Sequence, residues 1–440
     1  MTLMRLTPKP GFMGFFQAPA WVWIVALVPR FVLCALAAID PKLVLRGDST
    51  GYLALAENLI AHGVFSTDQA APFIANTIRT PGYPIFLSFF TALHASIVWA
   101  AVVQSILGAL SVVCLWNWLN RLGCGRGAVW AALMLAFDPV TVLNTPLIST
   151  EALFNFLLVS AAIMTWVELR TMESQLVRAA TTGVLWSLAA LVRPISLLLP
   201  LLLCWIWRRD KKKFLVFLAA AFLFPAIWVT RNHQATGFAV FSSIGGNALL
   251  RGPAASVESI STGKPWDELD EELRAQVDAQ HPQGYASEAA QSNEYGKLGR
   301  RILRAHPFLL IRHCAGGVIR LWGGTGLEMF REWIPFRGGY DPSGVKPHAF
   351  VTGQGTLTLL RRDKWLIPVQ IFYMLALATL YWSALGGLYF LWRQGRRGEM
   401  IFLSICIVYF TALSSGQASY RYRIPIIPFF AAAAAFKNRS

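Results

Sequence analysis

Residues 20–39 read AWVWIVALVPRFVLCALAAI, an apolar run about as long as the roughly 20 residues that a helix needs to cross a bilayer. Arg5 and Lys9 precede it, and Pro29-Arg30 interrupts it. Because the run is long for the apolar core of a signal peptide, we interpret it as an uncleaved first membrane span. The basic residues ahead of it favour the cytoplasmic side, so the N-terminus is expected inside.

Further apolar runs follow along the chain. Residues 40–79 are mixed and polar and are expected outside, whereas Pro84–Leu119 is too long for one span and predicts a membrane-edge helix followed by one crossing. The later runs cover residues 128–137, 151–169, 179–192, 195–207, 214–229, 366–392, 400–413 and 424–436. Together they predict about ten crossings, with both termini cytoplasmic.

The composition and charge agree with this topology. Of the 440 residues, 55% are hydrophobic and 14% are charged, which excludes an ordinary soluble globule with its typical share of about 25%. The net charge is +16, and basic clusters at 121–126, 208–213, 393–397 and 437–439 all fall on the predicted cytoplasmic side. A nucleic-acid module would gather its basic residues on one polar face, so no nucleic-acid partner is expected.

The chain divides into three regions. Residues 1–230 form an N-terminal transmembrane module with a first external loop at 40–83, and residues 365–440 form C-terminal transmembrane helices. Residues 231–364 hold 13 of the 23 acidic residues and are predicted to form an external subdomain. Amphipathic helices are predicted there at 265–280 and 288–305, followed at 306–322 by a helix on the membrane surface. The expected fold class is an all-α multi-spanning membrane protein.

Arginines gather on the predicted outer face, where the positive-inside rule does not favour them. Six lie there or in an outer turn: Arg46, Arg79, Arg193, Arg231, Arg421 and Arg423. The acids that flank the same spans are few: Asp48, Asp68, Asp138 and Glu151. Unpaired charges at a membrane edge are costly, so the set predicts an external anion such as a phosphate. For a single arginine, interfacial snorkelling is the alternative.

Two carboxylates each allow a structural and a functional interpretation. Asp48 precedes an amphipathic helix that is expected to end near Gly63, so it either caps that helix or acts as a general base at the membrane surface. Glu151 is either an acid in the first turn of its span or a carboxylate near the same site. Gly245-Gly246 would let backbone N–H groups approach a phosphate.

Seven motifs occur in a characteristic order. They are Gly47-Asp48 with Tyr52, Arg79-Thr80-Pro81-Gly82-Tyr83-Pro84, Thr150-Glu151, Leu191-Val192-Arg193-Pro194, Trp228 with Arg231-Asn232, Gly245-Gly246-Asn247, and Tyr420-Arg421-Tyr422-Arg423-Ile424-Pro425 with Pro428. The ordered set resembles the polyprenyl-phosphate-sugar-dependent glycosyltransferases of the GT-C superfamily. The most similar group is the bacterial relatives of protein O-mannosyltransferases and of the lipid A aminoarabinose transferase.

The resemblance implies a GT-C-like helical bundle with a small external helical domain in the inner (plasma) membrane, with its active site on the periplasmic face. The enzyme would move a sugar from an isoprenoid phosphate to a lipid, glycan or protein acceptor. Asp48 takes the position of the catalytic acid of the first loop. The residues implied in binding the donor phosphate and sugar are Tyr52, Arg79, Tyr83, Glu151, Arg193, Arg231, Asn232, Asn247, Arg421 and Arg423.

Chemistry adds three expectations. One-step displacement of the lipid phosphate predicts inversion at the anomeric carbon. No cofactor is required and no residue cluster calls for a metal, although a divalent cation could assist. The alternative function is a transporter or flippase of an anionic lipid or lipid-linked sugar, which predicts cations along a path through the bilayer.

Overall fold

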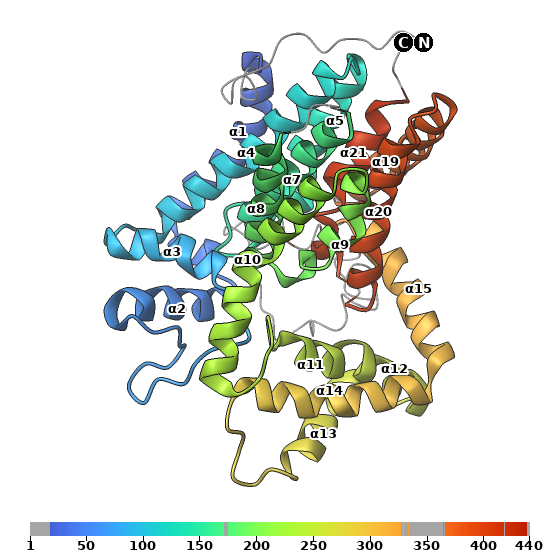
Figure 1. Ribbon diagram of the computed structural model, residues 1–440. Coiled ribbons are helices and arrows are strands. Elements are labelled where there is room, and N and C mark those ends of the chain that lie inside the picture. The colour runs from blue at the N-terminus through green and yellow to red at the C-terminus, as the bar shows by residue number, and fades with distance from the viewer. Residues whose placement is uncertain are drawn as a thin grey trace.

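The computed structural model describes residues 18–170, 175–326, 329, 333, 364, 366–417 and 419–437. In this part of the chain every regular element is a helix and no strand is present. Figure 1 shows a large helical bundle above a smaller layer of helices, which we call the lower layer. The all-helical prediction is therefore confirmed for the described residues.

Among the described residues, six helices are long and apolar enough to cross a membrane. They are α1 (Ala20–Ile39), α4 (Ile97–Arg121), α7 (Glu151–Arg170), α10 (Lys211–Thr236), α19 (Leu366–Arg393) and α20 (Arg397–Ser415). The other four predicted crossings fall on shorter elements: α5 (Arg126–Phe137), α8 (Leu176–Val192), α9 (Leu199–Leu203) with its flanking 3-10 turns, and α21 (Ile427–Ala435). Whether these shorter helices also cross stays a prediction.

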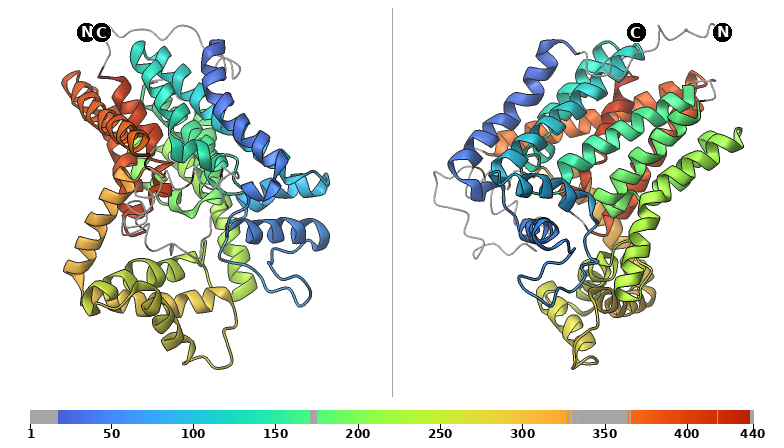
Figure 2. Two further views of the ribbon diagram at one scale, coloured as in Figure 1. Left: turned by 180° about the vertical axis from the view of Figure 1, so that it is seen from behind. Right: turned by 60° about the vertical axis from the view of Figure 1, so that its left-hand side comes forward.

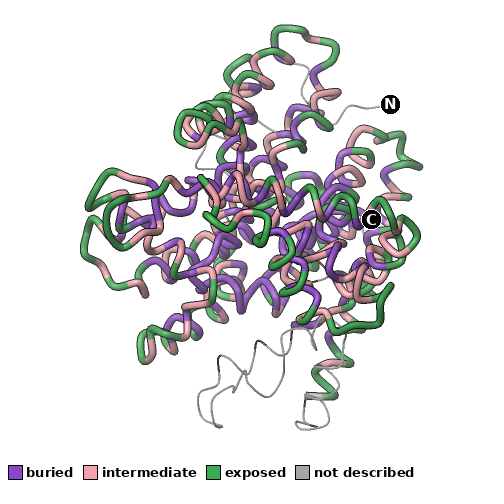
Figure 3. The backbone as a smooth tube through the Cα atoms, turned by 90° about the horizontal axis from the view of Figure 1, so that it is seen from below, coloured by how far each residue is buried: buried purple, intermediate pink, exposed green. Residues whose placement is uncertain are grey.

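Close backbone approaches hold the bundle together. A Cβ atom on Gly183 of α8 would lie 2.5 Å from the carbonyl oxygen of Phe217 on α10, and one on Gly387 of α19 would lie 1.8 Å from that of Ala433 on α21. Such small residues let apolar helices pack tightly where lipid offers no hydrophobic drive for association. Figure 3 shows buried residues running through the middle of the molecule, with exposed ones at its edge.

The predicted membrane-edge helix is a separate element. α3 (Gly82–Ala92) ends before α4 begins, and the Ser96 side chain between them accepts a hydrogen bond from the N–H of Val98. α2 (Ser49–His62) packs against α3, and the pair projects from one side of the bundle (Figure 1). This pair flanks most of the loop that the sequence predicts to be external.

The lower layer has a small core of its own. It contains α11 (Ile244–Leu249), α12 (Ala255–Thr262), α13 (Trp266–Asp278) and α14 (Glu288–Ala305), and it confirms the helices predicted at 265–280 and 288–305. Buried residues of this core include Leu250, Val257, Leu273 and Tyr295. α15 (Pro307–Gly323) leads from this layer back to α20, as the left view in Figure 2 shows. Its inclination to a bilayer stays a prediction, and most of 327–363 lies outside the described residues.

Short elements complete the frame around the first loop and the C-terminal helices. They are η2 (Pro41–Val44), α6 (Pro139–Asn144) and η6 (Tyr420–Arg423). η6 immediately precedes α21 and contacts α15 and α20. The motif rich in Tyr and Arg is therefore placed at the end of the bundle that α15 joins to the lower layer.

Candidate functional site

Five charged side chains from distant segments meet in one group, which we call the charged cluster: Asp48, Arg79, Glu151, Arg193 and Arg421. The Asp48 carboxylate lies 2.6 Å from Nη2 of Arg79, through Oδ1, and 3.9 Å from Nη1 of Arg421, through Oδ2. All five were predicted as site residues from the sequence. The structure brings them together from the residue before α2, the turn before α3, α7, the residue after α8 and η6.

The second acid of the cluster, Glu151, already accepts hydrogen bonds from two arginines. Arg421 holds Glu151 with two bonds, Nε to Oε1 at 2.6 Å and Nη2 to Oε2 at 3.1 Å, and Arg193 adds a bond of 2.6 Å to Oε1. The Glu151 side chain is 2% exposed, whereas that of Asp48 is 45% exposed. Asp48 is therefore the carboxylate of the cluster that an incoming molecule can reach.

The cluster carries three guanidinium groups against two carboxylates. Burial by itself would lower the pKa of Arg79, but the neighbouring Tyr52 and Asp48 raise it above its usual value. Burial likewise opposes the charge of Arg421, and the contact with Glu151 outweighs it, so the pKa of Arg421 is also raised. Both arginines therefore stay protonated, and the cluster keeps a surplus of positive charge suited to an anion.

Tyr52 forms one wall of the cluster. The Arg79 guanidinium lies 4.8 Å from the centre of the Tyr52 ring, and its Nη1 donates to the Tyr52 hydroxyl at 3.2 Å. Burial raises the pKa of Tyr52, which keeps this hydroxyl neutral. Tyr83 was predicted to bind the donor, but it is fully buried behind Tyr52 and donates its own hydroxyl to Oε1 of Gln104 at 2.6 Å. Its ring packs edge-to-face against that of Tyr52, with ring centres 5.0 Å apart.

Asp48 occupies the N-cap position of α2 without capping it. The residue has helical backbone angles, and its side chain makes no capping bond. Ser49 ties the start of the helix to the bundle instead, donating from Oγ to the carbonyl of Ile148 at 2.8 Å. The predicted end of the helix at Gly63 is confirmed by its left-handed φ of 66°. The capping interpretation of Asp48 is therefore wrong, because its carboxylate points to Arg79.

The turn that carries Arg79 rests on the end of α8. A Cβ atom on Gly82 would lie 2.8 Å from the backbone of Leu191, so only glycine fits there without a shift. Thr80 donates from Oγ1 to the carbonyl of Val192 at 3.3 Å. Because Arg193 follows Val192 directly in the chain, this contact brings two motifs that are distant in the sequence into one cluster.

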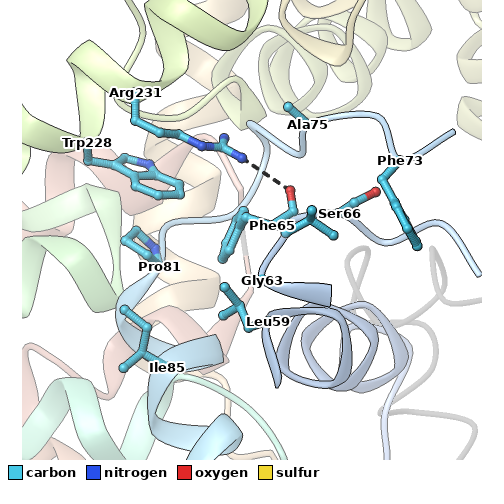
Figure 4. A pocket seen from close by; sticks show the side chains of 11 residues that line it. Leu59, Gly63, Phe65, Ser66, Phe73, Ala75, Pro81, Ile85, Trp228 and Arg231 are labelled. Carbon is cyan, nitrogen blue, oxygen red and sulfur yellow. Dashed lines mark hydrogen bonds between the residues drawn. The ribbon is translucent and has the colours of Figure 1, made fainter. Parts of the chain in front are cut away.

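Arg231 lies in a different place from the one predicted. It lines a cavity of about 440 Å³ between α2, α3 and α10, most of whose lining is apolar (Figure 4). Its guanidinium lies 4.9 Å from the centre of the Trp228 ring and donates to the carbonyls of Asn76 at 2.9 Å and Phe65 at 3.3 Å. Asn232 is buried and orients Arg231 by accepting a bond of 3.0 Å. None of the contacts that the described residues give Arg231 is to Asp48.

Arg423, which was also predicted to bind the donor, lies away from the cluster. Arg423 is fully buried and donates to the carbonyls of Leu321, Trp322 and Gly324, while Asp138 lies 3.6 Å away. Because it is buried and bonded to backbone carbonyls, we interpret Arg423 as a structural residue.

Asn247 was expected in the site and is instead a half-exposed residue of α11 in the lower layer. The N–H of the neighbouring Gly246 donates to Oγ of Ser292 at 3.0 Å. The expectation that Gly245-Gly246 receives a phosphate is therefore wrong for Gly246, because its N–H group serves helix packing.

Sequence reasoning missed two residues that hold the site. The Asn76 side chain accepts from the N–H of Arg79 at 3.0 Å and donates to Glu288 of α14 at 2.9 Å. Asn76 lies in an irregular loop, and Glu288 looks like an ordinary acid in the first turn of a helix. No signal in the sequence pairs them, because they are 212 residues apart.

Within the described ranges, no three His, Cys, Asp or Glu side chains gather as a metal site would require. No protein-family model matches the chain, and no curated protein matches it. The chemistry of the charged cluster is therefore derived from its geometry. An accessible carboxylate beside fixed guanidinium groups can orient a hydroxyl and stabilise an anion in the same place.

Proposed function

We propose that the protein is a membrane glycosyltransferase that moves a sugar from an isoprenoid phosphate to a lipid, glycan or protein acceptor. One observation carries the proposal: Asp48 is half-exposed and held beside the guanidinium groups of Arg79 and Arg421. A base and an anion-binding group are the two elements that this transfer needs. The ordered motifs that resemble GT-C enzymes add support from the sequence.

The reaction follows from the positions of these groups. Asp48 takes the proton of an acceptor hydroxyl, whose oxygen attacks the anomeric carbon as the bond from that carbon to the phosphate oxygen breaks. The electron pair leaves with the lipid phosphate, and Arg79 and Arg421 stabilise its growing charge. Glu151 is a positioning residue, because it fixes Arg421 and Arg193. A single displacement inverts the configuration of the sugar.

The apolar cavity beside Arg231 suits the lipid part of the donor. Its lining includes Leu59, Phe65, Ile85 and Trp228, which offer contacts to a hydrocarbon chain, and Arg231 supplies one cation at its wall. In this proposal the chain segment next to the phosphate occupies the cavity and the sugar lies at the charged cluster. Arg231 then attracts the phosphate from the side of the lipid.

The proposed location is the inner (plasma) membrane, with both termini cytoplasmic and the charged cluster on the periplasmic side. The first turn of α10 is rich in lysine and lies at the end of that helix away from the lower layer (Figure 2). Basic residues at that end agree with the positive-inside rule. The lower layer would then face the periplasm.

The catalytic role of Asp48 is tested by replacing it with Asn. Mass spectrometry of envelope glycolipids and glycoproteins from cells with and without the protein first identifies the product, as a mass difference of one sugar. Asp48→Asn removes the base while keeping the size of the side chain, and we expect transfer to fall about 10²- to 10⁴-fold with normal expression.

Asp40→Asn is the matched control, because Asp40 belongs to the same segment before α2 and, among the described residues, its side chain is bonded to the N–H of Lys42 at the surface, away from the charged cluster. It should transfer sugar like the wild type. Full transfer by Asp48→Asn would reject the catalytic assignment. A protein that moves an anionic lipid or lipid-linked sugar across vesicles without any gain of sugar on an acceptor would be a transporter or flippase.

A further inference from the structure

The backbone that carries Arg79 is held by a carboxylate from the lower layer. Glu288 is the first residue of α14, and its Oε2 accepts from the N–H of Thr77 at 2.9 Å and from that of Ile78 at 3.4 Å. Its Oε1 accepts from the Asn76 side chain at 2.9 Å. A single half-buried carboxylate therefore satisfies three donors from three consecutive residues.

Asn76, which is bonded to Glu288, also accepts hydrogen bonds from two arginines. Its Oδ1 accepts from the N–H of Arg79, and its carbonyl accepts from Arg231. The segment 76–79 therefore links the lower layer, the charged cluster and the cavity. A shift of this segment moves Arg79 relative to Asp48 and Arg231 relative to the cavity.

We propose that Glu288 is a positioning residue, whose ionised carboxylate holds the backbone of residues 76–78 and thereby fixes Arg79 against Asp48. The inference rests on the proposed function, because Arg79 and Asp48 form the site that Glu288 serves. It also gives the lower layer a role in positioning the site. Displacements of about 1 Å at a catalytic group are large enough to slow a reaction strongly.

The proposal predicts a pH dependence. Asp68 and Arg79 from the first external loop and Arg231 from α10 are the charged groups that face Glu288. Burial raises the pKa of Glu288, which the N–H groups of Thr77 and Ile78 oppose. When the carboxyl takes up a proton, one acceptor oxygen becomes a donor and faces an N–H group. Transfer should therefore fall as the pH drops through this raised pKa.

Stability changes with pH in the opposite direction. Because the folded protein raises the pKa of Glu288, it binds this proton more tightly than the unfolded chain does. The contribution of Glu288 to stability is present at low pH and is lost as the pH rises through the folded pKa. A loss of transfer at acidic pH can therefore be separated from unfolding caused by this group.

Glu288→Gln should leave the fold intact, because the segment has further bonds to the loop before α11. The N–H of Ser243 donates to the carbonyl of Thr77 at 2.8 Å, and Ser242 donates from Oγ to that of Ile78 at 2.6 Å. Gln keeps the size of the side chain but has one acceptor oxygen instead of two and no negative charge, so it cannot accept from all three donors as the carboxylate does. The matched control is Glu294→Gln, on the same helix, whose carboxylate pairs with Lys297.

The first measurement is amide hydrogen exchange of the full chain in lipid nanodiscs, from about pH 4 to about pH 8 and corrected for intrinsic exchange rates, so that the range begins below the usual pKa of a glutamate. Residues 77 and 78 of the wild type should lose protection as the pH falls. Glu288→Gln should show low protection throughout this range, and Glu294→Gln should behave like the wild type. Wild-type protection in Glu288→Gln would overturn the inference.

The second measurement is the pH profile of sugar transfer. Glu288→Gln should lower kcat about tenfold with little change in the KM for the acceptor. In its pH profile, the fall in transfer at acidic pH should be weaker than in the wild type. An unchanged kcat and pH profile would overturn the positioning role. Hydrogen exchange requires no sugar donor, so a failure of the proposed function, seen as full transfer by Asp48→Asn, is distinguishable from a failure of the Glu288 contact.

Discussion

Two carboxylates in one cluster differ in what surrounds them. Asp48 is exposed on one side and contacts Arg79 on the other, so a substrate hydroxyl can bind to its exposed side. Glu151 is enclosed and bound by Arg193 and Arg421 together. Accessibility to the substrate suits a general base, and enclosure suits a residue that positions others.

This difference in burial predicts that replacing each carboxylate by its amide has different effects on stability. Glu151→Gln leaves two largely buried arginines without their carboxylate, and removing one partner of a buried ion pair typically costs about 3–5 kcal/mol. We expect a clearly lower free energy of unfolding and a lower yield of folded protein, measured by thermal unfolding in detergent. Asp48→Asn should unfold like the wild type.

Glu272→Gln is a suitable control for Glu151→Gln, because Glu272 pairs with Lys264 on the exposed surface and such pairs contribute little. It should unfold like the wild type. If Glu151→Gln were as stable as this control, Arg193 and Arg421 would not depend on Glu151, and its assignment as a positioning residue would be wrong.

At the scale of elements, the site depends on one close approach. The turn before α3 rests on the last residues of α8, and this contact places Arg79 and Arg193 within the same cluster. Proline on both sides of Gly82 limits how far the turn can yield. The contact between α3 and α8 therefore helps to position the charged residues of the site.

Gly82→Ala tests this contact. The added Cβ would meet the backbone of Leu191 at 2.8 Å, and backbone atoms cannot turn aside as a flexible side chain can. We expect a loss of stability of about 1–3 kcal/mol, typical of overpacking, together with reduced transfer. Thermal unfolding and the sugar-transfer assay measure the two effects.

Gly51→Ala is the matched control, because Gly51 lies in α2 near Asp48 and an added Cβ there meets no atom within 4 Å. Alanine also favours a helix more than glycine does, so this variant should be at least as stable as the wild type. Equal behaviour of Gly82→Ala and Gly51→Ala would contradict a tight contact between α3 and α8.

At the scale of the whole molecule, the bundle and the lower layer differ in composition. The bundle contains the long apolar helices, and the lower layer contains polar helices around a small core. The charged cluster, Glu288 and the cavity beside Arg231 all involve the segments that join these two parts. In the proposed orientation, a site at this junction meets lipid on one side and water on the other.

The proposed orientation predicts which positions a membrane-impermeant maleimide reaches in intact cells. Gln280→Cys, exposed in the lower layer, should be labelled once the outer membrane is permeable, whereas Arg209→Cys, exposed before α10, should be labelled only after cell lysis. Cys204 and Cys314, which are partly exposed, are replaced by Ser in both variants. Labelling of both positions from the same side would contradict the topology.

Much of the fold could be predicted because lipid imposes simple conditions on sequence. A spanning helix must be long and apolar, so the runs at 20–39 and 151–169 appear directly in the amino-acid order, and their helices begin at Ala20 and Glu151. The amphipathic pattern likewise located α14. Local patterns of this kind require no knowledge of distant residues.

The sequence by itself therefore determined the helical class, the positions of the long apolar helices and a short set of arginines and acids as candidate site residues. Only the tertiary structure decided how those charges are distributed: Arg421 on Glu151, Arg423 beside Asp138, and Arg231 in a separate cavity. It also added Glu288, which no local pattern distinguishes from other helix-starting acids. The physical reason is that an ion pair depends on distances in space, and helices far apart in the chain set those distances when they pack.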